Sequence, residues 1–366
     1  MNTYTVVFKP RGALSTWPLS SDTLFGAVCW GIRVLGLMDD HELSAWLEAS
    51  YDQPLFAFSQ AFPIFESKQR VYRFYPRPVS FQPGFTDFDI LVDQMKSVAG
   101  RKSALLIVTT EAKRLKKVQY LSEQALFHWM NGSLRPIDVL QSMIGGKDQW
   151  TVRAGAICST NESEDLPDSL LISEAMQHNE IDRMAGATVE GRLFYREEVF
   201  FSRQVGLWAL LMAEQDVCDS YIFPALRYLA DTGLGADRTT GKGQFEIMIQ
   251  PAPVFSTPAT AYGMMSLSRY IPLSGEVNLL GEPLAYQLRI LHPKREQKFP
   301  RALIGGQTSA PIYKASVPVF EPGSVFPFLE RKSIYGRLVR LSPNDQESIF
   351  QSGAAIMIPF GLGETA

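Results

Sequence analysis

The spacing of apolar residues divides the chain into helical and extended segments. Apolar residues at helical spacing predict helices over residues 18–35, 40–50, 85–99 and 221–230. Extended character predicts strands over residues 3–9, 55–59, 70–75, 104–110, 192–201, 205–214 and 244–249. The pattern therefore predicts a chain built from both kinds of element.

The last third of the chain is predicted to be rich in strands. A proline-rich stretch over residues 251–258 predicts a linker. Beyond it, extended segments are predicted over residues 261–272, 284–293, 312–320, 336–341 and 354–360. Because 366 residues exceed one ordinary core, we expect two domains, at residues 1–250 and 251–366.

Two charged runs interrupt the apolar pattern. Residues 113–117 contain four basic side chains and open a predicted helical stretch that reaches Trp129. A basic run is usually a solvated face, and here it is also a candidate contact for nucleic acid. The acidic residues 161–165 are typical of a mobile loop or a hairpin tip.

Composition limits the class of protein. With 46% hydrophobic and 20% charged residues, the chain is globular rather than disordered. The N-terminal residues have no signal-peptide pattern, the apolar runs are too short to span a bilayer, and the three isolated cysteines argue against disulfides, so we expect a cytoplasmic setting. A net charge of −3 leaves nucleic acid only local basic patches, while acidic regions can face a protein partner.

Glycine-rich residues 233–243 follow a predicted helix and precede a predicted strand. This order does not fit a nucleotide-binding P-loop, and neither does the spacing, because five residues separate Gly235 from Gly241 where a P-loop has four. Gly243 also follows Lys242 where a P-loop has Ser or Thr. Glycines let backbone approach a phosphate, and Arg238 and Lys242 add charge. We favour a loop that holds a polyanion over a glycine-rich turn without a ligand.

Two further segments are candidates for binding. Ser20, Ser21 and Asp22 are good N-cap residues, and a helix N-terminus can receive a phosphate, although an ordinary capped helix explains most of the pattern. Residues 177–191 are dense in polar side chains just ahead of a strand, which suits a loop that grips a polar ligand. The alternative for that segment is an Asp182–Arg183 pair that holds a turn.

Known catalytic signatures are missing from the sequence. The four histidines have no metal-ligand spacing to another histidine or cysteine, and no nucleophile elbow or dinucleotide fingerprint occurs. Asp39 and Asp40 lie where a helix start favours acids. We therefore expect no metal, no cofactor and no active site.

Three segments together resemble the RAMP superfamily of CRISPR-associated proteins. They are residues 21–26, residues 178–183 and the glycine-rich residues 233–243, and the match in order covers residues 3–250. Within that superfamily, they are similar to the subunit that caps the 5′ tag of the CRISPR RNA in type III-A (Csm) interference complexes. The equivalent subunit of the type III-B (Cmr) complex remains an alternative.

The resemblance implies an α+β fold of tandem ferredoxin-like (RRM-like) domains. The first would hold a long insertion, approximately residues 100–190, between its second and third strands. It also implies a non-catalytic, RNA-binding subunit that docks beside the large polymerase-type subunit and the backbone RAMP subunit and contacts target RNA only indirectly. The implied RNA-binding residues are Lys9, Arg11, Ser21, Asp22, Thr23, His178, Arg183, Gly235, Arg238, Thr239, Thr240, Gly241, Lys242 and Gly243.

Two expectations concern His178 and the insertion. The alternative function is a RAMP endoribonuclease that processes CRISPR repeat RNA with His178 as general acid or base. By resemblance, the region around residues 161–168 forms a thumb-like hairpin that crosses the guide–target duplex. Its apolar flanks would wedge into the duplex, namely Ile157, Leu166, Leu170, Leu171 and Met176.

Overall fold

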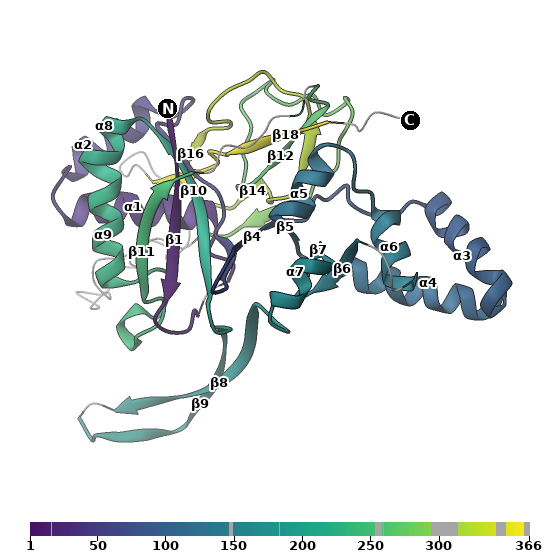
Figure 1. Cartoon of the computed structure of the whole chain (residues 1–366). Helices are drawn as coiled ribbons and strands as arrows, with labels where there is room; N and C mark the ends of the chain where they lie inside the picture. The colour runs from purple at the N-terminus through teal and green to yellow at the C-terminus, as the bar shows by residue number, and fades with distance from the viewer. Residues whose placement is uncertain are drawn as a thin grey trace.

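The computed structural model describes residues 1–15, 17–145, 149–182, 184–252, 258, 260–293, 314–341 and 349–361 (Figure 1). Its α-helices are α1 Ser21–Val34, α2 Asp40–Ala49, α3 Phe85–Ala99, α4 Arg101–Lys116, α5 Glu123–Met130, α6 Pro136–Gly145, α7 Thr160–Asp165, α8 Gln215–Val217 and α9 Phe223–Thr232. Together with the strands below, they confirm the expected mixture of helices and strands.

A mixed sheet forms the centre of the molecule. Its strands run in the order β11-β1-β10-β3-β4-β5-β7-β6, and β2 also pairs with β10. Their bounds are β1 Asn2–Pro10, β2 Phe56–Phe58, β3 Phe62–Glu66, β4 Val71–Pro76, β5 Tyr120–Ser122, β6 Trp150–Arg153, β7 Ala156–Ser159, β10 Val205–Ala213 and β11 Phe245–Pro251. The first predicted strand therefore lies between β10 and β11, antiparallel to both.

Alternation along β1 gives the sheet two buried faces. Val6 and Phe8 pack into one apolar cluster, and Val7 between them packs into the other. Helices α1, α2 and α9 gather beside β1 and β11 in Figure 1. The helices α1 and α9 approach closely where Gly31 meets Ala225, because a Cβ at Gly31 would lie 3.0 Å from that of Ala225.

A helical branch extends from the far end of the sheet, where α3, α4 and α6 pack together (Figure 1). The helix predicted over residues 85–99 is confirmed as α3, but the strand predicted over residues 104–110 is wrong because it lies inside α4. That helix buries Ala104, Val108, Ala112 and Leu115, which follow a helical period that the short apolar run concealed. The predicted helix to Trp129 is instead interrupted by β5.

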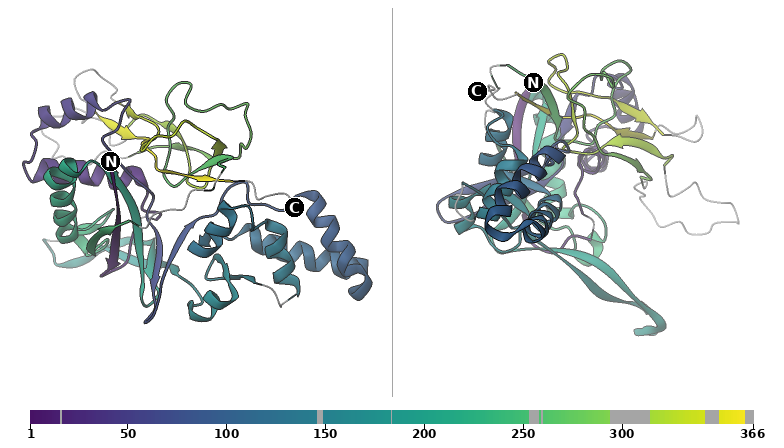
Figure 2. Two further views of the ribbon diagram at one scale, coloured as in Figure 1. Left: turned by 45° about the horizontal axis from the view of Figure 1, so that its top comes forward. Right: turned by 90° about the vertical axis from the view of Figure 1, so that its right-hand side faces the viewer.

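A long two-stranded hairpin, β8 Leu171–Asp182 and β9 Ala187–Phe201, projects from the body (Figures 1 and 2). The polar residues 177–182, expected in a loop, therefore lie in β8, while Arg183 lies outside the described residues. The acidic residues 161–165, expected at a mobile tip, form α7 instead. A capping box between Ser159 and Glu162 starts that helix, and Glu162 is buried.

The apolar flanks expected to wedge between bases are mostly core residues. Ile157, Leu166 and Leu170 are buried in the same apolar cluster as the helical branch. Leu171 packs against that cluster at the root of the hairpin, and only Met176 is exposed. The expected wedge is therefore wrong for Ile157, Leu166 and Leu170, because these apolar side chains are buried against their own chain, whereas for the exposed Met176 it stays a prediction.

The last part of the chain forms short strands, as predicted. They are β12 Gly263–Ser266, β13 Leu288–Leu291, β14 Val317–Phe320, β15 Val325–Pro327, β16 Leu338–Arg340, β17 Phe350–Ser352 and β18 Met357–Phe360. Strand β12 lies between β15 and β18. Met265, Ile356 and Phe360 share an apolar cluster with Phe62 of the main sheet, so the two parts of the chain pack directly on one another. Residues 253–257 of the expected linker lie outside the described residues.

Candidate nucleic-acid interface

The glycine-rich residues 233–243, hereafter the glycine loop, are closed at the base by two glycines. The amide of Leu234 donates to the carbonyl of Gly243 at 2.8 Å. A Cβ on Gly243 would lie 1.8 Å from the carbonyl oxygen of Leu234, and one on Gly233 would lie 2.7 Å from the side chain of Gln244. All four glycines have positive φ angles, but Gly235 and Gly241 have open space where a side chain would be. The base thus requires glycine for packing, and the outer part leaves backbone accessible.

Hydrogen bonds order the outer part of the loop. Asp237 is left-handed, and its carbonyl accepts from the amide and hydroxyl of Thr240 and from the amide of Lys242. The amide of Gly241 donates to Arg238. Within the described part of the chain, the amides of Gly235, Ala236 and Asp237 donate to no group. These successive donors are therefore the part of the loop that can bind an anion.

The hairpin holds the glycine loop through a buried carboxylate. Glu198 on β9 has a 1% exposed side chain and pairs with both Lys242 of the loop and His178 of β8, the latter at 2.9 Å. His178 also stacks on Phe194 of the opposite strand. The structure therefore brings His178 and Lys242 together around one carboxylate, in a cluster that joins the hairpin to the loop.

A second pair joins the same elements closer to solvent. Arg196 of β9 donates to the carboxylate of Asp237, and this guanidinium holds the pKa of Asp237 below its usual value. On the other side of the loop, Ser15 donates to the carbonyl of Ala236 at 2.8 Å. The amide of Gly243 donates to the carbonyl of Ala13 at 2.9 Å. The glycine loop is thus held between the hairpin and the segment after β1.

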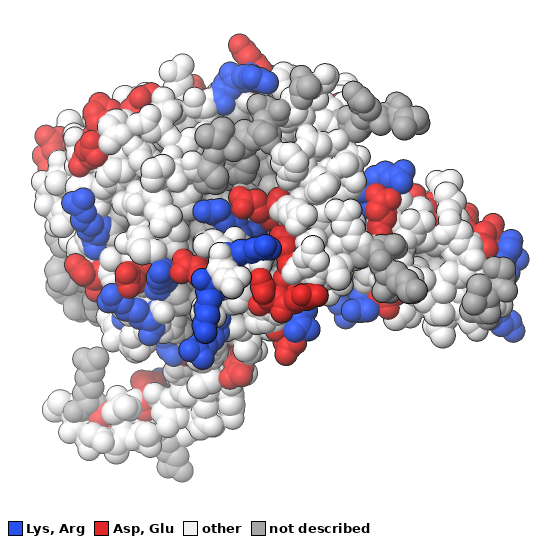
Figure 3. All heavy atoms as spheres, in the orientation of Figure 1, with Lys and Arg blue, Asp and Glu red and all other residues white. Residues whose placement is uncertain are grey.

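Two basic residues near the glycine loop, Lys9 and Arg11, are paired with acids. Lys9 pairs with Glu66 at 3.2 Å, and Arg11 pairs with Glu246 at 3.8 Å. In Figure 3, Lys and Arg side chains gather on the lower part of the body, above the projecting hairpin, with Asp and Glu among them. The backbone donors of Gly235, Ala236 and Asp237 are therefore stronger candidates for contact with an anion than these paired basic side chains.

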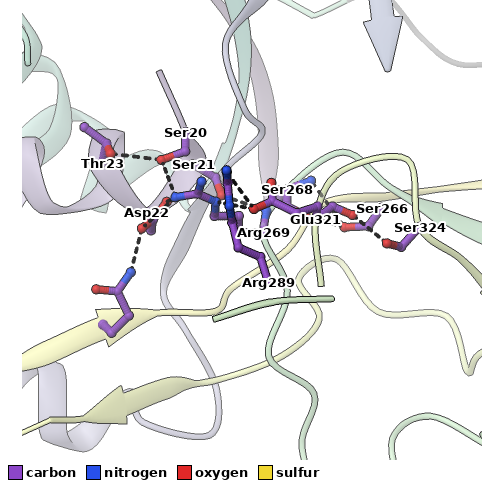
Figure 4. Close-up of polar contacts among 11 residues, drawn as sticks. Ser20, Ser21, Asp22, Thr23, Ser266, Ser268, Arg269, Arg289, Glu321 and Ser324 are labelled. Carbon is purple, nitrogen blue, oxygen red and sulfur yellow. Dashed lines mark hydrogen bonds and ion pairs between the residues drawn. The ribbon is translucent and has the colours of Figure 1, made fainter. Parts of the chain in front are cut away.

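The start of α1 is occupied by protein instead of being open to a ligand (Figure 4). Ser21 is buried and accepts from the amide of Arg269 at 2.9 Å. The Arg269 guanidinium pairs with Asp22 at 3.1 Å and with Glu321 at 3.4 Å. Thr23 lies 2.9 Å from Ser20 through their hydroxyl groups. These groups therefore join α1 to the last part of the chain.

Sequence reasoning missed Glu198, Arg196, Asp237 and Arg269 as organising residues. Their partners lie 20 to 44 residues away in sequence around the glycine loop, and 247 residues away for Asp22 and Arg269, so no local spacing signals them.

Cys29, Cys158 and Cys218 are buried free thiols, and burial raises the pKa of Cys29 to about 12. The described residues contain no cluster suited to a metal ion, and none of their helices is both long and apolar enough to cross a membrane.

Comparison with known proteins identifies the kind of protein that has this architecture. A scan against protein-family models finds no match. The chain is 26% identical over 267 residues to the CRISPR system protein Csm4 of Thermococcus onnurineus (strain NA1), which covers 72% of this chain and 73% of the relative. These values support similarity along most of both proteins.

Solved structures share the fold over nearly the whole chain. A chain of the Csm3–Csm4 subcomplex from a type III-A CRISPR–Cas interference complex matches with a TM-score of 0.62 and 15% identity, over 98% of this chain and 99% of that one. A chain of a Csm1–Csm4 cassette in complex with cA4 matches with a TM-score of 0.55 and 17% identity, over all of both chains. Sequence and fold together resemble those of a Csm-type RAMP subunit, which confirms the resemblance predicted from the motifs. The particular subunit that the chain resembles is Csm4 of type III-A CRISPR systems.

Proposed function

We propose that this chain is the non-catalytic RNA-binding subunit of a type III-A complex in antiviral defence, and that it holds the 5′ tag of the CRISPR RNA. The observation that carries the proposal is the glycine loop, where the amides of Gly235, Ala236 and Asp237 are available in a chain similar to Csm4. A row of backbone donors suits RNA phosphates, because such contacts position a strand without reading its bases.

The ferredoxin-like part of the proposal rests on strand order. Strands β11, β1, β10 and β3 with helices α1 and α9 reproduce the 4-1-3-2 order of a βαββαβ unit. Residues 1–250 would then be the first domain and residues 251–366 the second. The insertion, expected at approximately residues 100–190, would be longer and comprise all the elements between β3 and β10. The partners are proposed from the similarity to chains in Csm1–Csm4 and Csm3–Csm4 structures, with a large subunit on one side and a backbone subunit on the other.

Residues around the glycine loop divide into three proposed roles. Gly235, Arg238 and Thr239 would face the RNA, since the loop is open at these positions or carries a donor there. Lys242 and His178 would act through Glu198, by fixing where the hairpin stands relative to the loop. Thr240, Gly241 and Gly243 would keep the loop in shape.

Binding to a tagged RNA tests this function. Arg238→Ala should weaken binding of an RNA with the constant 5′ tag by about 1–3 kcal/mol and reduce the salt slope by about 0.7. Arg227→Ala is the matched control, because this exposed arginine lies on α9 just before the loop and should leave binding unchanged. If Arg238→Ala, Arg227→Ala and the native chain bind the tagged RNA with equal affinity, the proposed contact between the glycine loop and the RNA is wrong.

One observation favours the endoribonuclease alternative: His178 and Lys242 both contact the carboxylate of Glu198. The same contact opposes it, because Nε2 of His178 is bonded to buried Glu198, where a general acid or base must reach the RNA. We expect repeat RNA to stay intact after incubation with the purified chain. RNA cleavage that His178→Ala abolishes would establish the alternative.

A further inference from the structure

A cavity of about 590 Å³ lies at the root of the hairpin, on the face opposite the glycine loop contacts. Strands alternate their side chains, so His178, Arg196 and Glu198 face the loop while Ser173, Glu197 and Val199 line the cavity. The cavity is completed by the segments on either side of it, through Ser15, Trp17, Lys117, Gln119 and Tyr120. Its size is within the range of small-ligand pockets.

The cavity is linked to the glycine loop through Ser15. Ser15 lines the cavity, and its hydroxyl donates to the carbonyl of Ala236 in the loop at 2.8 Å. Leu14 and Val199 exchange backbone hydrogen bonds of 2.9 and 2.8 Å, which fixes the segment after β1 against the hairpin root. A single residue, Ser15, therefore contacts both the cavity and the carbonyl of Ala236 in the loop.

The lining has the chemistry of a site for a nucleobase. Trp17 is half-buried and lines the cavity, and aromatic rings stack on bases of any sequence. Tyr120 is 8% exposed, and its hydroxyl makes no hydrogen bond to any described residue. Burial raises the pKa of Tyr120, so the hydroxyl stays protonated as a donor at neutral pH.

The lysines at the end of α4 give the cavity a basic edge. Lys117 lines it, and Lys113 and Lys116 lie within the preceding turn. Within the described residues, none of these three ammonium groups has an ion-pair partner, unlike Lys9, Arg11 and Lys242 nearby. The basic run in the sequence is thus the part of this region whose charge is available to a phosphate.

We propose that this cavity receives one unstacked base of the bound RNA, stacked on Trp17 and hydrogen-bonded to Tyr120, with the adjoining phosphate at Lys117. The proposal rests on the proposed function, because it continues the RNA from the glycine loop across the hairpin root to the end of α4. A base in this position is out of the stack, so the site would fix the register of the strand without depending on its sequence.

A cycle of protein and RNA changes tests the proposal on the full chain. Single abasic sites are placed at each position of the tagged RNA, and affinities are measured for the native chain, Trp17→Ala and Tyr120→Phe. At one position, the abasic RNA should bind the native chain about 10-fold more weakly, and that loss should vanish in Trp17→Ala. Trp30→Ala, which removes a half-buried tryptophan from α1, should keep the loss. Tyr120→Phe guards against misfolding, because it removes only the hydroxyl and should reduce the same loss.

Lysine substitutions and a free nucleotide complete the test. Lys117→Ala should reduce the salt slope of RNA binding by about 0.7, whereas Lys102→Ala at the other end of α4 should not. If RNA binding depends on Arg238 but no position couples to Trp17, the cavity proposal is overturned and the proposed function stands. If no tagged RNA binds, the proposed function fails first. Quenching of the chain's tryptophan fluorescence by adenosine monophosphate that is lost in Trp17→Ala, with no coupled RNA position, would reassign the cavity to a free nucleotide.

Discussion

Glu198→Gln is the substitution that most directly tests how the hairpin and the glycine loop are joined. The change keeps the shape of the side chain and removes the negative charge that Lys242 and His178 share. Removing one partner of a fully buried ion pair costs about 3–5 kcal/mol. Lys242 is 21% exposed and can regain part of its hydration, so we expect a loss of about 1–3 kcal/mol in the local stability of the joint.

Hydrogen exchange measures that loss where it occurs. The amides of β8 and β9 near Glu198 should exchange about 10-fold faster in Glu198→Gln than in the native chain. Glu174→Gln is the matched control, because Glu174 lies opposite Glu198 in the hairpin register but is exposed. Its exchange rates should equal those of the native chain.

The same substitution should also change RNA binding, and there it should strengthen an interaction instead of weakening one. With Glu198 neutral, the charge of Lys242 is released, so the salt slope for single-stranded RNA should become steeper by about 0.7. Native exchange rates together with a native salt slope would refute the reasoning, since the carboxylate would then neither hold the hairpin nor neutralise the lysine.

Three further predictions concern the loop, its second ion pair and the hairpin root. Gly243→Ala should unfold the loop base, because its Cβ would lie 1.8 Å from a carbonyl oxygen. Gly235→Ala should cost only about 1–2 kcal/mol, from its left-handed backbone. The thermal unfolding midpoint should therefore fall further in Gly243→Ala than in Gly235→Ala. Arg196 lowers the pKa of Asp237 in the folded state. The ion pair therefore stabilises the folded chain at a pH above the pKa that Asp237 has in the unfolded chain, and this stabilisation is lost as the pH falls through the lower pKa of Asp237 in the folded chain. The difference in thermal unfolding midpoint between the native chain and Asp237→Asn should therefore decrease from pH 7 to pH 3. A constant difference in midpoint would show that the pair does not titrate in this range. Leu170→Asp should destabilise the chain by about 3 kcal/mol or more because the side chain is 2% exposed, while Met176→Asp should cost little; equal unfolding midpoints would contradict the burial of Leu170.

Sequence alone determined the elements whose signal is local. The apolar periods of β1, α1, α2, α3 and α9 are complete within each segment, so their positions could be predicted from residue spacing. The glycine loop was found for the same reason, since glycines between a helix and a strand are a local mark of irregular backbone. The order of three such segments was sufficient to predict the resemblance to the RAMP superfamily, which the similarity to Csm4 confirmed.

Only the tertiary structure decided which side chains meet. Apolar residues near Val108 fit a strand until their burial against α3 and α6 shows a helix, and the acidic run at Glu162 fits a mobile tip until its buried cap is seen. Glu198 is one of several charged residues on a strand, and nothing near it in the sequence indicates that it is buried between His178 and Lys242. The physical reason is that local periodicity reports which face of an element is buried, whereas ion pairs, cavities and joints depend on what other segments bring to that face.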